Sequence, residues 1–260
     1  MANHVGICRL CGDREKLQKS HIIPAGIFRH MITDGKEKGL TLIKKGRPPE
    51  TGKRGNGEYE HLLCQRCERG LAPYDEHGIK FIKNELGVGF CSMETENTPR
   101  LEYFMGIDIM KLHYFFLSLL WRISVSTRPL FSSVSLPNSE GMLKRCVEDM
   151  VFSRPLVRQE RFVFSLLRFS NYKNPFALIK NPELFSFDNH IFCDIYIGPY
   201  KLSIQADDSI IPTTKQARIR TDVMFTTQAT ISEIITIEED SEYERIMAHI
   251  DASVKAMRDA

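Results

Sequence analysis

The sequence predicts an α+β fold: an N-terminal zinc-stapled module, residues 1–90, followed by a mixed α+β domain, residues 101–260. Three observations predict this fold. Two Cys-x-x-Cys pairs lie in the first part, apolar residues recur at helical spacing in the middle, and short aromatic and β-branched runs follow.

The two cysteine pairs are Cys8 with Cys11 and Cys64 with Cys67, and 52 residues separate them. A Cys-x-x-Cys turn brings two sulfurs close enough to share one tetrahedral ion, and a second pair completes a four-cysteine site typical of structural Zn²⁺. The alternatives are a redox pair and coincidence. A thioredoxin-like redox pair belongs to a βαβ unit, which this segment does not indicate.

Helices are predicted in the second part at residues 107–126, 139–151 and 241–257. The first has a continuous apolar face with Asp108 near its start, and a second apolar side indicates that it is buried. Ser139 is expected as the N-cap of the second helix. Within the first helix, Trp121 and Arg122 are expected to be a buried Trp beside a paired Arg, the alternative being a partner contact.

Strands are predicted from alternation and composition at residues 161–169, 190–197, 200–205, 223–227 and 231–237. Gly198-Pro199 between the second and third of these indicates a hairpin. Residues 91–100 are polar and without periodicity, so we expect a linker or surface loop there.

Charge is unevenly distributed along the chain. Residues 1–70 hold 14 Lys and Arg against 8 Asp and Glu, and a basic, glycine-rich stretch runs from Lys36 to Arg54. Such a segment suits a nucleic-acid backbone, although solvated loops often have the same composition. We identify no signal peptide and no apolar run near the roughly 20 residues that span a bilayer, so we expect a cytoplasmic protein that does not enter membranes.

Three segments resemble one known family. CRLCG at residues 8–12, SHIIP at 20–24 and LLCQRCE at 62–68 are similar to the HNH family of ββα-metal endonucleases, in the zinc-knuckle variant found in bacterial anti-phage defence proteins. The resemblance covers residues 8–86. It implies that His21 is the general base of a DNA phosphodiesterase and that a divalent cation, Mg²⁺, Mn²⁺ or Ni²⁺, stabilises the charge that develops on phosphate.

The resemblance also suggests ligands for that cation. Ser20 stands where the family commonly has Asp, and Glu68 stands where it has Asn or His. We expect the catalytic site to comprise His21, Asp75, Glu68 and His77, with a helix beginning near residues 70–73 and Asp75 in its first turn. The alternatives are a histidine at a hairpin edge and an acidic residue that interacts only with the helix dipole.

Three functions therefore compete. The first is a metal-dependent endonuclease that cuts DNA, RNA not being excluded, with the C-terminal domain serving self-association, sensing or a protein partner. The second is a catalytically inactive zinc module that binds nucleic acid or a protein. The third is a purely structural zinc ribbon.

Overall fold

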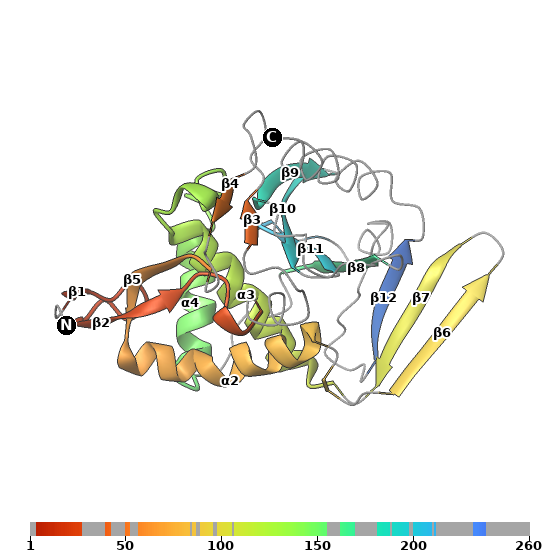
Figure 1. Cartoon of the computed structure of the whole chain (residues 1–260), viewed down its shortest axis with the longest axis horizontal. Helices are drawn as coiled ribbons and strands as arrows, with labels where there is room; N and C mark the ends of the chain where they lie inside the picture. Colours follow the sequence, from red (N-terminus) through yellow and green to blue (C-terminus); the bar gives the residue numbers. More distant parts are fainter. Residues whose placement is uncertain are drawn as a thin grey trace.

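The computed structural model is an α+β fold, which confirms the predicted class. Its helices accompany a three-stranded, a two-stranded and a seven-stranded sheet (Figure 1). The structure describes residues 4–27, 40–42, 50–52, 57–83, 85–86, 89–95, 98–105, 107–154, 162–169, 181–187, 189–197, 200–209, 211 and 231–237.

The N-terminal part is built on the antiparallel sheet β1–β2–β5. Its strands are β1 (Val5–Ile7), β2 (Arg14–His21) and β5 (Tyr59–Cys64), and helix α2 (Gln65–Ile82) follows β5 without a loop. Between β2 and β5 the chain adds the two-stranded sheet of β3 (Leu40–Leu42) and β4 (Glu50–Gly52). Strands β2 and β5 pair antiparallel, and helix α2 follows them in the chain.

Helix α2 begins at Gln65, so the expected start near residues 70–73 is wrong. Cys64 is the N-cap residue and Cys67 lies in the first turn, which means that the second cysteine pair itself opens the helix. Pro73 lies inside the helix, where it lacks the N–H that would complete the backbone ladder. Asp75 and His77 therefore lie in the middle of α2, beyond the turn on which the helix dipole acts.

The predicted central helices are confirmed as α3 (Ile109–Val125) and α4 (Glu140–Val151), separated by the short helix η1 (Pro129–Phe131). The Asp108 side chain caps α3 by accepting from the backbone N–H of Lys111 at 3.0 Å. Ser139 stands at the N-cap position of α4, but its hydroxyl donates to the carbonyl of Ala206 at 2.5 Å. It therefore joins the start of α4 to the chain beyond β11 instead of capping the helix.

The large sheet has the order β6–β7–β12–β8–β11–β10–β9. All neighbours are antiparallel except β12 and β8 (Figure 1). Its strands are β6 (Gly89–Thr95), β7 (Thr98–Met105), β8 (Phe164–Phe169), β9 (Glu183–Phe187), β10 (His190–Ile197), β11 (Tyr200–Gln205) and β12 (Ile231–Ile237).

Three of the strand predictions, residues 190–197, 200–205 and 231–237, agree with the structure, and β8 begins later than predicted. The loop expected at residues 91–100 is wrong, because residues 91–95 belong to β6 and residues 98–100 to β7. These residues have no apolar pattern, and they are strands because β7 pairs with β6 on one side and with β12 on the other. The predicted strand at 223–227 and helix at 241–257 lie outside the described residues.

One large hydrophobic core cluster contains described residues from both parts of the chain. Its buried residues run from Cys8 and Leu10 through Leu71 of α2 and Phe115 of α3 to Ile204 of β11. The division into segments 1–90 and 101–260 stays a prediction, but within the described residues helix α2 packs directly on α3 and α4. None of the described helices is long and apolar enough to cross a membrane.

Glycines let α2 approach these helices closely. A Cβ added at Gly78 would lie 2.3 Å from the ring of Phe115, and one at Gly70 would lie 2.5 Å from Val151 of α4. Both positions therefore exclude larger side chains unless the neighbour moves.

Candidate metal centre and the adjoining His21 face

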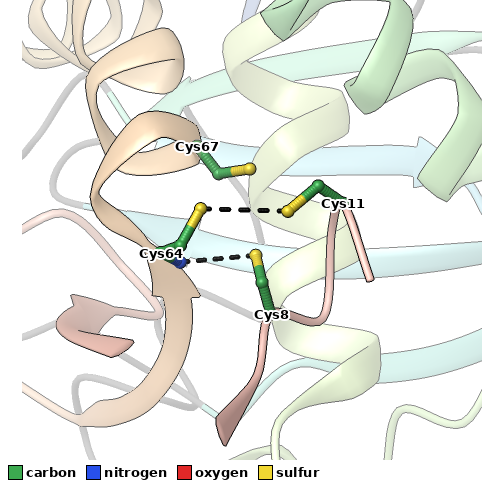
Figure 2. A group of neighbouring side chains, drawn as sticks. All are labelled: Cys8, Cys11, Cys64 and Cys67. Atoms are coloured by element: carbon green, nitrogen blue, oxygen red, sulfur yellow. Dashed lines mark hydrogen bonds between the residues drawn. The ribbon is translucent and has the colours of Figure 1, made fainter. Parts of the chain in front are cut away.

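Four cysteines converge where β1, β2, β5 and α2 meet. Cys8 and Cys11 come from the turn between β1 and β2, Cys64 ends β5, and Cys67 lies in the first turn of α2 (Figure 2). Their sulfurs all lie within 4.8 Å of one another, and those of Cys11 and Cys64 are 3.8 Å apart. A tetrahedral ion with Zn–S bonds of about 2.3 Å separates its sulfurs by about 3.8 Å. The four cysteines thus form a group that fits a metal ion such as zinc.

Local backbone hydrogen bonds shape this group. The N–H of Cys8 donates to the Asp13 carbonyl at 2.9 Å, and the N–H of Gly12 donates to the Cys8 carbonyl at 2.9 Å. Gly12 has a φ of 79°, a conformation that glycine adopts without strain. On the other side, the N–H of Cys64 donates to the Cys8 sulfur at 3.3 Å. Both knuckles therefore present their sulfurs to one point.

The thiols of Cys8, Cys11 and Cys67 differ in pKa. A hydrogen bond from Cys67 lowers the pKa of the Cys8 thiol to about 4, whereas the same contact raises the pKa of Cys67, and burial raises that of Cys11. Four adjacent sulfurs cannot all ionise without a nearby cation. A bound divalent ion removes this conflict, because it stabilises every thiolate at once.

His21 ends β2, opposite Tyr59 at the start of β5. Their ring centroids are 6.1 Å apart. Two cations flank the exposed Tyr59 ring, with Lys19 Nζ 5.2 Å and the Arg128 guanidinium carbon 5.7 Å from its centroid. We call His21, Lys19, Tyr59 and Arg128 the His21 face.

Ser20 points to the face of the sheet opposite to that of His21, because successive strand residues point to opposite faces. Glu68 of α2 lies beside it. Ser20 is buried, and its hydroxyl accepts from the N–H of Leu63 at 3.1 Å. Ser20 also contacts Glu68, but burial outweighs that contact and raises the pKa of the Glu68 carboxyl. Among the described residues, Glu68 Oε1 has no hydrogen-bond partner.

Asp75 is held by Arg122 of α3. The guanidinium donates to both carboxylate oxygens, at 2.6 Å and 3.0 Å, and to the backbone carbonyl of His21 at 3.2 Å. The expected buried pairing of Arg122 beside Trp121 is thereby confirmed. Asp75 thus joins α2 to α3, and both of its carboxylate oxygens accept hydrogen bonds from Arg122.

His77 lies elsewhere, near Asp108 and Lys111 at the start of α3, where burial lowers its pKa. The structure thus brings Ser20, Glu68, Asp75 and the His21 backbone together, but not the side chains of His21 and His77. Within the described ranges, the four cysteines are the one group of three or more His, Cys, Asp or Glu that is close enough to hold a metal.

Sequence reasoning overlooked the roles of Tyr59 and Arg128. Nothing local marks either residue, because each acquires its surroundings through strand pairing and through the chain that follows α3.

Comparison of the chain with protein-family models, with curated proteins and with solved structures gives no match in any of the three.

Proposed function

We propose that this protein is a zinc-stabilised nucleic-acid-binding protein that contacts the phosphate backbone through the His21 face. The observation that carries the proposal is the exposed Tyr59 ring flanked by Lys19 and Arg128, beside His21. Cations that neutralise phosphates supply most of the affinity for nucleic acids, and an exposed aromatic ring offers a surface on which a base stacks.

Zinc has a structural role in this proposal. An ion held by Cys8, Cys11, Cys64 and Cys67 would join the β1–β2 turn to the β5–α2 junction, since the pairs come from these two places. Such an ion contributes folding free energy directly. It would fix both strands that carry the His21 face.

The excess of positive charge favours a polyanionic ligand such as a nucleic acid. The first 70 residues carry an excess of Lys and Arg, mostly outside the described residues. Glu58 lies 3.9 Å from Arg128 and offsets part of the positive charge of the His21 face, so we expect moderate, salt-sensitive binding. DNA is the first expected partner and RNA the second.

Fluorescence anisotropy with labelled duplex DNA, single-stranded DNA and RNA tests this proposal. Lys19→Gln should weaken binding and lower the slope of log K against log salt by about 0.7–0.9, the value for one lost phosphate contact. Tyr59→Leu should weaken single-strand binding most, because it removes the stacking surface. Lys144→Gln, a change on α4, which carries none of the residues of the His21 face, is the matched control and should bind as the wild type does. Lack of wild-type binding at low salt would overturn the proposal.

A second candidate is a metal-dependent endonuclease with His21 as general base, acting as an anti-phage defence effector. It is favoured by the position of His21 at the end of the first strand of the β2–β5–α2 arrangement. A divalent cation would stabilise the charge that develops on phosphate. The described residues do not fit such an ion, because Arg122 engages Asp75 and His77 lies apart.

Plasmid nicking assays separate the two candidates. Wild-type protein with Mg²⁺, Mn²⁺ or Ni²⁺ would nick DNA if the second candidate is correct, and His21→Ala would not. Binding without nicking in any of these metals would support the first candidate alone.

A further inference from the structure

The end of α3 and the residues after it bind the strand ends that carry the His21 face. Arg122 donates to the carbonyl of His21 at 3.2 Å, and Arg128 Nε donates to the carbonyl of Tyr59 at 2.8 Å. Between them, the N–H of Thr127 donates to Glu60 Oε1 at 2.9 Å. Residues 67 to 101 positions apart in sequence thus form one side of the face.

We propose that Arg122 is a positioning residue that fixes the His21 end of β2 and so sets the geometry of the His21 face. The inference rests on the proposed function, since it concerns the same face. It adds that α3, in the second part of the chain, is a component of that site.

The contacts of Arg122 leave its guanidinium no freedom. Besides Asp75 and the His21 carbonyl, it donates from Nε to the Ser118 carbonyl at 3.3 Å and from Nη2 to the Ser118 hydroxyl at 3.2 Å. The side chain is only 3 % exposed, so a polynucleotide cannot reach it. Its influence on the His21 face therefore passes through the backbone of β2.

A purely stabilising role explains this arrangement poorly. Taking a guanidinium and a carboxylate out of water costs free energy that their attraction often only balances, and apolar residues of similar size commonly serve stability as well. The neighbouring side chains of Leu119, Leu120, Trp121 and Ile123 already supply apolar packing to α3. What an apolar residue cannot supply is a directed bond to the His21 carbonyl.

A double-mutant cycle tests the inference on the full-length, zinc-loaded protein. Arg122→Lys keeps the charge but loses the planar fork that holds Asp75 and His21 together. We expect it to weaken nucleic-acid binding about tenfold in the wild-type background. In the His21→Ala background the same change should cost less than about twofold, because the imidazole that Arg122 positions through the β2 backbone is gone, although the backbone carbonyl remains. Equal losses in both backgrounds would overturn the proposal.

A second variant covers the case in which Arg122→Lys does not fold. Arg122→Met combined with Asp75→Leu replaces the ion pair by apolar side chains and is expected to keep the fold and the zinc. The imidazole NMR signals of His21 should shift in this variant, whereas those of His190, which lies in β10, should not. Unchanged His21 signals would contradict positioning.

These readouts also separate failure of the inference from failure of the proposed function. If the wild-type protein binds no nucleic acid, the proposed function fails, and the His21 signals alone decide the positioning role. If binding occurs but neither the cycle nor the signals respond to Arg122, the function stands and the inference fails.

Discussion

Gly78 of α2 lies directly against the ring of Phe115 of α3, where an added Cβ would be 2.3 Å from the ring carbons Cγ and Cδ1. Both residues are buried, so neither side has space into which to move. This contact sets the distance between α2, which carries Cys67, and α3, which carries Arg122, whereas the contact of Gly70 on Val151 sets the distance between α2 and α4.

We expect Gly78→Ala to destabilise the protein by about 1–2 kcal/mol. Overpacking of a filled core costs about 1–3 kcal/mol, and the better helix propensity of Ala returns up to about 1 kcal/mol of it. Urea denaturation measures the difference. Gly141→Ala in α4 is the matched control, because nothing lies within 4 Å of its added Cβ, and it should stabilise slightly. Equal effects of the two changes would contradict the close approach of α2 and α3.

Loss of one metal ligand should release the ion and destabilise the zinc-side elements. We expect Cys11→Ser to lower the zinc content well below one equivalent and to reduce the free energy of unfolding by several kcal/mol, on the order of 3–5. Cys146→Ser, a change at a partly buried cysteine of α4, is the control and should keep a full equivalent. Metal analysis and thermal unfolding measure both. Full zinc content in the Cys11 variant would contradict the four-cysteine site.

Local chemistry made parts of this structure predictable. Cys-x-x-Cys spacing is set by the ligand geometry of one ion, so the four sulfurs could be grouped without knowledge of the fold. Strands β10 and β11 combine β-branched and aromatic residues with a Gly-Pro turn, and their predicted bounds agree with the structure.

Long-range contacts explain what could not be predicted. Strand β7 of the β6–β7 hairpin also pairs with β12, which is distant in sequence, and residues 91–100 have no apolar alternation. Asp75 was predicted as a metal ligand from its residue type and its neighbours. Its partner Arg122 lies 47 residues further along the chain and became evident only once α3 was packed on α2.

Because the Asp75–Arg122 pair is largely buried, removing one partner should cost far more unfolding free energy than it does in an exposed pair of the same length. We expect Asp75→Ala to cost about 2–4 kcal/mol, because it leaves a buried guanidinium without its two carboxylate bonds. Asp13→Ala is the matched control, since Asp13 and Arg66 also approach to 2.6 Å but are more than half exposed. That change should cost less than about 1 kcal/mol. Similar losses of unfolding free energy in both variants would show that burial is not decisive here.

His113 should make the stability of the fold depend on pH. It lies buried in α3 with Phe164 of β8 edge-on at 4.5 Å, and burial lowers its pKa to about 4, from about 6.5 in the unfolded chain. The unfolded state therefore binds the proton more readily. Stability is complete above pH 6.5 and is lost as the pH falls from 6.5 towards 4.

Replacing His113 by Phe removes this dependence while keeping an aromatic ring against Phe164. Between pH 7 and pH 4.5 the wild type should lose about 2–3 kcal/mol more unfolding free energy than His113→Phe does. Each pH unit between the two pKa values contributes about 1.4 kcal/mol. Protonation of the zinc cysteines affects both proteins equally and cancels in the comparison. Denaturation curves from pH 7 to pH 4.5 measure the difference, and parallel pH profiles would mean that His113 does not titrate as a buried group.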